Sequence, residues 1–104
     1  MIIMHVYVEW IREECGGRTE GLGRIGLKPM IRWQRYVREW MSLAWDVHVI
    51  AADVDPQTRC GMTELEVPPY ASLEDKFLVE GEEIELLDGS CVIAVGKIRK
   101  IQRN

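Results

Sequence analysis

The sequence has too few nucleophilic and metal-binding residues to indicate an enzyme. Histidine occurs only twice, at His5 and His48, and neither a GxSxG nucleophile motif nor a GxxxxGK[ST] phosphate-binding loop is present. Asp46 and His48 share one face of a predicted strand and would form an acid–base pair or a partial metal site, or simply part of a polar face. Because a zinc site needs three or four ligands, we expect no catalytic residues, no bound metal and no cofactor.

Cysteine is also scarce, and long hydrophobic runs are missing. The three cysteines, Cys15, Cys60 and Cys91, are odd in number and form no CxxC pair. This usage is typical of reduced thiols in a cytoplasmic protein. No uncharged stretch approaches the roughly 20 residues that a membrane-spanning helix needs. We therefore expect a cytoplasmic protein without a membrane partner.

Charge is present in both signs but is unevenly distributed along the chain. Residues 64–88 carry nine acidic residues and one basic residue, whereas residues 89–104 carry four basic residues and no acidic one. Residues 1–63 carry eight of each, and the net charge is −4. A uniformly basic nucleic-acid-binding protein would not show this pattern. Two interpretations stay open: two solvated faces that neutralise each other, or a bipolar surface that orients a partner.

Alternation of apolar and polar residues predicts an all-β fold. Apolar residues recur at every second position, which is the period of a strand with one wet face, in residues 2–12, 45–50, 63–67 and 82–87. Residues 91–95 are almost wholly apolar and predict a strand that is well covered. Asp88-Gly89 predicts a hairpin turn before that strand, and Gly96 predicts a bend or bulge within it.

The number and spacing of these strands indicate the architecture. A chain of 104 residues forms one domain, here residues 1–104, with a single modest core. Five or six short strands, with turns about every ten residues, favour a barrel or a sandwich. We predict a small antiparallel, Greek-key-like β-barrel.

One segment does not follow the strand period. Within residues 31–44, apolar residues fall on one helical stripe, which predicts a short helix near 34–42. The alternative is a strand through Met30–Gln34 followed by a loop. Both interpretations hold if the strand is short and the helix begins near Gln34.

The same segment is the strongest candidate for a binding surface. Arginine and aromatic residues interleave there, as they do at protein-binding hot spots and on platforms that stack unpaired bases. The alternative is that the aromatic side chains belong to the core and the arginines surround it. The candidate residues are Arg32, Trp33, Arg35, Tyr36, Arg38, Trp40 and Trp45.

Both ends of the chain resemble the C-terminal barrel domain of elongation factor Tu. The resemblance rests on residues 6–8, on the acidic and Gly-Gly-Arg-Thr stretch of 13–19, on residues 27–33 and on the closing hairpin of 79–98. It covers just over half of the chain. It implies a small antiparallel barrel and contacts to the transfer-RNA backbone, with Arg18 in the position of the family's turn arginine.

These observations lead to two main functional hypotheses. The first is a non-catalytic binding or protein-interaction module that associates with a protein, including a second copy of itself as a homodimer, through residues 31–45. The alternative is an accessory protein that binds RNA through Arg18, the arginines of 32–38 and the basic C-terminus, with Lys97, Arg99 and Lys100 as contacts. An enzyme of unknown chemistry is the third.

Overall fold

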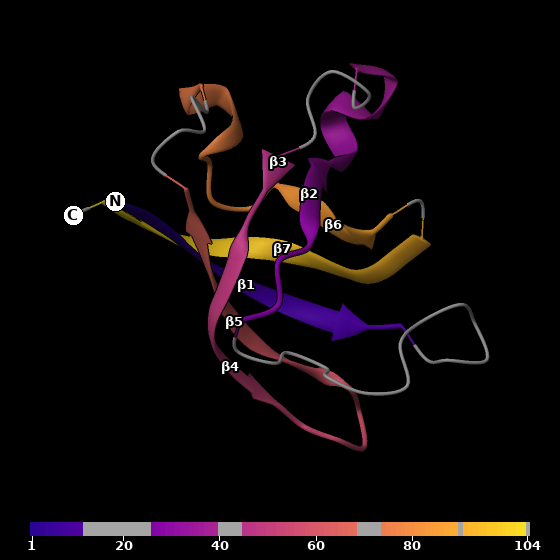
Figure 1. Ribbon diagram of the computed structural model, residues 1–104. Coiled ribbons are helices and arrows are strands. Elements are labelled where there is room, and N and C mark those ends of the chain that lie inside the picture. Colours follow the sequence, from indigo (N-terminus) through magenta and orange to yellow (C-terminus); the bar gives the residue numbers. More distant parts are fainter. Residues whose placement is uncertain (12–25, 40–44, 69–73, 90, 104) are drawn as a thin grey trace.

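A computed structural model describes residues 1–11, 26–39, 45–68, 74–89 and 91–103. Within these ranges the chain is all-β, with seven strands and two short 3₁₀ helices (Figure 1). The strands are β1 (Ile2–Trp10), β2 (Met30–Trp33), β3 (Trp45–Asp46), β4 (His48–Val54), β5 (Cys60–Val67), β6 (Glu83–Asp88) and β7 (Cys91–Arg103). The helices are η2 (Gln34–Glu39) and η3 (Asp75–Phe77). The predicted fold class is thereby confirmed.

The strands form one antiparallel sheet that curls until its two ends meet. Its order is β3-β2-β6-β7-β1-β5-β4, so the two end strands are neighbours in sequence, separated only by Val47. The N–H of Val49 donates to the carbonyl of Leu27 over 2.9 Å, while Val49 pairs with Leu65 of β5 on its other side. The segment from β3 to β4 runs across the front of the curled sheet in Figure 1. The fold is therefore barrel-like.

The alternating residues of the predicted strands line the inside of this sheet. In β1 the side chains of Met4, Val6, Val8 and Trp10 are at most 1% exposed. The same alternation holds in β5, where Thr63, Leu65 and Val67 are buried. The core thus follows directly from the two-residue period of the strands.

The segment that begins at residue 30 contains both the short strand and the helix that the sequence allowed. β2 ends at Trp33, and η2 begins at Gln34. The helix is of the 3₁₀ type and is kinked at Tyr36, whose backbone angles are φ −112° and ψ 26°. Residues 40–42 of the predicted helix lie outside the described residues.

Two expectations about the outer face of the sheet were wrong. Glu85 was expected on a wet face but is 7% exposed, because Arg32 of the neighbouring strand pairs with it and covers it. Cys91 and Val95 were expected to be covered but are exposed, Val95 by 39%. Val95 lies on the outward side of β7 with Lys97, two residues on, although it is apolar. Cys91 lies at the start of β7, where it pairs with the exposed Asp88.

Gly96 allows β7 to lie close to β1, and it is not a bulge. It pairs in regular register with Val8, and the register shifts of β7 occur on either side of it. A Cβ atom at this position would overlap the carbonyl oxygen of Tyr7 and lie 2.7 Å from Cγ1 of Val8. The close pairing of β1 and β7 therefore requires glycine at position 96.

We predict that Gly96→Ala destabilises the protein by about 1 to 3 kcal/mol, the usual cost of forcing extra volume into a packed site. Urea unfolding followed by circular dichroism measures this loss. Cys91→Ala is the matched control, because Cys91 is exposed on the same strand. Equal stability of the two variants would show that β1 and β7 are not held this closely.

Candidate binding surface

The aromatic residues of the predicted surface form a cluster inside the fold. Trp33 is 1% exposed, and its ring centroid lies 4.9 Å from that of Phe77 and 5.9 Å from that of Trp45. Tyr36 lies 5.0 Å from Phe77 and, like Trp45, is partly buried against the core. Trp33 therefore follows the alternative interpretation, in which the aromatic side chains belong to the core, because it lies on the inner face of the curled sheet against Phe77 of η3. Trp40 lies outside the described residues.

The arginines of this segment bind carboxylates of the same chain. Arg32 Nη2 donates to Glu85 Oε2 over 2.8 Å, and only 15% of the Arg32 side chain is exposed. Arg35 Nε lies 2.9 Å from Glu82 Oε1, and the hydrogen bond to Glu82, followed by its negative charge, raises the pKa of Arg35. The side chain of Arg38 lies outside the described residues. Arg32 and Arg35 therefore anchor β2 and η2 to the β6 side of the sheet.

The residues proposed for RNA contact are only partly brought together. Arg18 lies outside the described residues. Lys97, Arg99 and Lys100 are exposed along β7, and the guanidinium carbon of Arg99 lies 5.8 Å from the ring centroid of Tyr7. Carboxylates lie on both neighbouring strands, with Glu9 of β1 beside Val95 and Glu83 of β6 beside Lys97. The basic residues therefore form a narrow stripe and not a broad basic surface.

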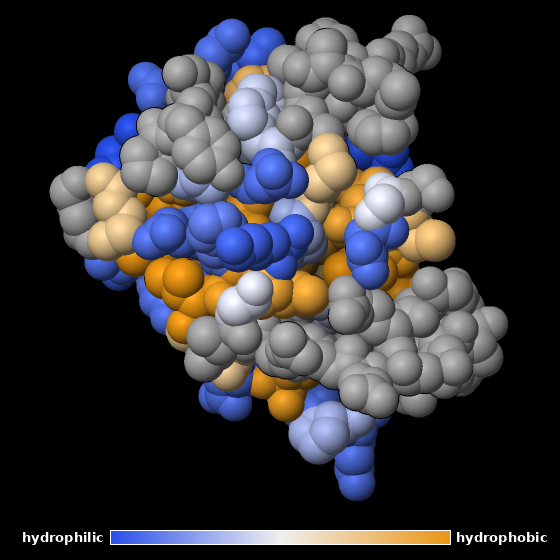
Figure 2. Space-filling model, viewed as in Figure 1, coloured by the Kyte–Doolittle hydropathy of each residue, from blue (hydrophilic) through white to orange (hydrophobic). Residues whose placement is uncertain are grey.

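A different surface, on the outer face of β5, β1 and β7, carries exposed apolar side chains. Tyr7, Met62 and Val95 are 43%, 38% and 39% exposed. Tyr7 is paired directly with Met62 across β1 and β5, and Val95 lies on β7 beside Glu9 of β1. On the opposite side of the molecule, which Figure 2 views with the β3–β4 segment in front, hydrophobic surface also reaches the solvent between hydrophilic side chains. Alternation alone assigns Tyr7 to the outer face of β5, β1 and β7, but no sequence pattern distinguishes it from an ordinary solvated position.

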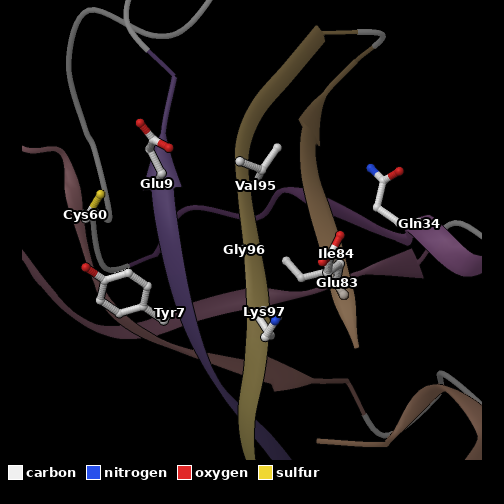
Figure 3. Close-up of a pocket in the computed structure, with 9 residues that line it drawn as sticks. All are labelled: Tyr7, Glu9, Gln34, Cys60, Glu83, Ile84, Val95, Gly96 and Lys97. Atoms are coloured by element: carbon white, nitrogen blue, oxygen red, sulfur yellow. The ribbon is translucent and has the colours of Figure 1, made fainter. Parts of the chain in front are cut away.

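A groove of about 390 Å³ runs along this outer face. Figure 3 shows Tyr7 and Glu9 on β1, with Cys60 of β5 on one side and β7 and β6 on the other. Gln34 of η2 stands at the far end. The complete lining is Tyr7, Glu9, Gln34, Cys60, Glu83, Ile84, Val95, Gly96 and Lys97.

The charged groups of the groove are not paired with other side chains of the described part of the chain. Within the described part of the chain, Glu9, Glu83 and Lys97 form no ion pair or hydrogen bond through their side chains. Cys60 Sγ lies 3.4 Å from the carbonyl oxygen of Thr58, as expected of a thiol donor. The groove therefore combines an apolar floor with unpaired charges of both signs.

The two histidines pair with glutamates of β5. His5 Nδ1 lies 3.4 Å from Glu64 Oε1, and its Nε2 lies 3.0 Å from Gln102 Oε1. His48 Nδ1 lies 3.8 Å from Glu66 Oε1. In the described ranges, no group of three or more His, Cys, Asp or Glu residues is arranged to hold a metal ion.

Comparisons with known proteins place the chain in no family: neither the protein-family models nor the curated proteins gave a match. Among the described residues, no helix has the length and apolar character needed to cross a membrane.

We predict that Glu85→Gln lowers the free energy of unfolding by about 1.5 to 3 kcal/mol, the range for losing a hydrogen bond between charged groups away from water. Thermal and urea unfolding measure the change. Glu82→Gln is the control and should have a much smaller effect, because 66% of its partner Arg35 is exposed and solvent screens that pair. Similar losses in both variants would contradict the structural role of the Arg32–Glu85 pair.

Proposed function

We propose that this chain is a non-catalytic protein-interaction module that binds its partner through the outer face of β5, β1 and β7. The observation that carries the proposal is the group of exposed apolar side chains Tyr7, Met62 and Val95 on adjacent strands. Tyrosine and methionine are enriched at protein interfaces. Contiguous exposed apolar surface with a polar rim is the usual mark of an interaction site.

The apolar residues alone supply limited affinity. Each is already more than half covered, so complete burial by a partner adds only about 1 kcal/mol per side chain. The remaining affinity has to come from the charged residues of this face, which include carboxylates (Glu9, Glu64 and Glu83) and cations (Lys97 and Lys100). A partner of this surface therefore presents an apolar centre and charges of both signs.

The barrel-like antiparallel sheet supports our interpretation that the fold is of the type seen in the C-terminal domain of elongation factor Tu. We do not extend this likeness to RNA binding. Of the proposed RNA contacts, Arg32 and Arg35 pair with Glu85 and Glu82. Phosphate binding needs several cations acting together, and here acidic residues lie beside them. The cysteine usage supports a cytoplasmic location, which is part of the same proposal.

The proposal predicts that a photo-crosslinking residue placed at position 62 forms a discrete protein adduct in cells that express the chain. The same residue at position 79 is the control, because Val79 is also exposed (44%) but lies outside the proposed face. The position-62 adduct should disappear when Tyr7→Glu is introduced. Nuclease-sensitive adducts would favour RNA as the partner, and equal adducts at both positions would contradict the proposed face.

A further inference from the structure

We propose that the partner on the outer face is a second copy of this chain, packed face to face about a two-fold axis that runs along β1. The inference rests on the proposed function and specifies its partner. The sequence predicted self-association through residues 31–45, but Trp33 of that segment is buried. We place the self-association instead on the outer face of β5, β1 and β7.

The register of the sheet places exposed side chains in transverse rows across β1. The central row contains five exposed residues, in the order Asp53, Met62, Tyr7, Lys97 and Glu83 from β4 to β6. Tyr7 lies at the centre of this row. The apolar surface is therefore in the middle of the face, with charged residues on both sides.

In a second row, the two neighbours of β1 carry opposite charges. His5 pairs with Glu64 of β5 on one side and with Lys100 of β7 on the other. Arg99 lies between the two rows, at the register shift where β7 has one residue more than β1. Its guanidinium group lies over the Tyr7 ring. Cations thus lie on the β7 side of β1, and a carboxylate faces them from the β5 side.

A two-fold axis along β1 brings these opposite charges together. Rotation about it exchanges the two sides of the face, so β7 of each copy lies over β5 of the other. Lys100 then meets Glu64 of the other copy, and the aliphatic stem of Lys97 covers Met62. Tyr7 lies against its own counterpart at the axis. Each contact away from the axis occurs twice, as an isologous interface requires.

The face fits a second copy better than a partner of one charge sign. A nucleic acid would meet Glu9, Glu64 and Glu83 beside the cations. An acidic or basic protein would meet like charges on one side of β1. At the ends of the central row, Asp53 of one copy approaches Glu83 of the other, but the curvature of the sheet leaves both at the solvated rim.

Because the apolar centre is small and these like charges approach each other at the rim, we expect a weak dimer with a dissociation constant in the micromolar range.

Analytical ultracentrifugation over protein concentrations from the low micromolar to the high micromolar range tests this dimer. The wild type should show a reversible monomer–dimer equilibrium. Lys100→Glu and Glu64→Lys should each raise the dissociation constant at least tenfold, and the double variant should restore association. Lys28→Glu is the control: Lys28 is exposed outside the outer face, and the change in net charge is the same as in Lys100→Glu. It should leave the equilibrium unchanged.

Circular dichroism verifies that each variant keeps its β spectrum, and Tyr7→Arg replaces Glu64→Lys if that variant unfolds. A wild type that stays monomeric throughout overturns the inference. A wild-type dimer whose dissociation constant is unchanged by Lys100→Glu also overturns the inference. If the wild type is monomeric but position 62 still cross-links to a different protein, the self-association fails while the proposed function stands. If position 62 forms no protein adduct, both fail.

Discussion

The structure depends on the backbone pairing that joins the two ends of the curled sheet. Val47 and Val49 donate their N–H groups to the carbonyls of Pro29 and Leu27 over 3.0 and 2.9 Å, and Val49 also accepts a hydrogen bond from the N–H of Gly26. On its other edge the same segment continues into β4 and pairs with β5. Without this double pairing the sheet would have two open edges, and its inner apolar face would lie open to water.

Closure of the sheet also determines which residues remain for binding. It brings β2 and β3 together with η3, so that Trp33, Trp45 and Phe77 pack on one another. The arginines between them then serve to neutralise carboxylates on the β6 side. The outer face of β5, β1 and β7 stays exposed, because its side chains lie opposite the core residues and meet solvent. The proposed partner surface is therefore a consequence of how the core is closed.

Much of the fold was predictable from the sequence, but the surface was not. The two-residue period identified the inward residues of β1, because that strand has one wet face. The same reasoning failed for Val95, because an apolar run carries no signal of which side faces water. It failed for Glu85 because its partner Arg32 is 53 residues away. The position of Trp33 depended on closure, and the transverse row through Tyr7 depended on strand register, neither of which a local pattern specifies.

Amide hydrogen exchange at Val47 and Val49 tests the closure of the sheet most directly. If the sheet is closed as described, these two amides exchange slowly, with protection comparable to that of the central strand β1, because both open only when the whole fold opens. Protection confined to β1, β5 and β7, with exchange at Val47 and Val49 near the rate of an unfolded chain, would show an open sheet. That result would contradict both the buried position of Trp33 and the assignment of the outer face as the binding surface.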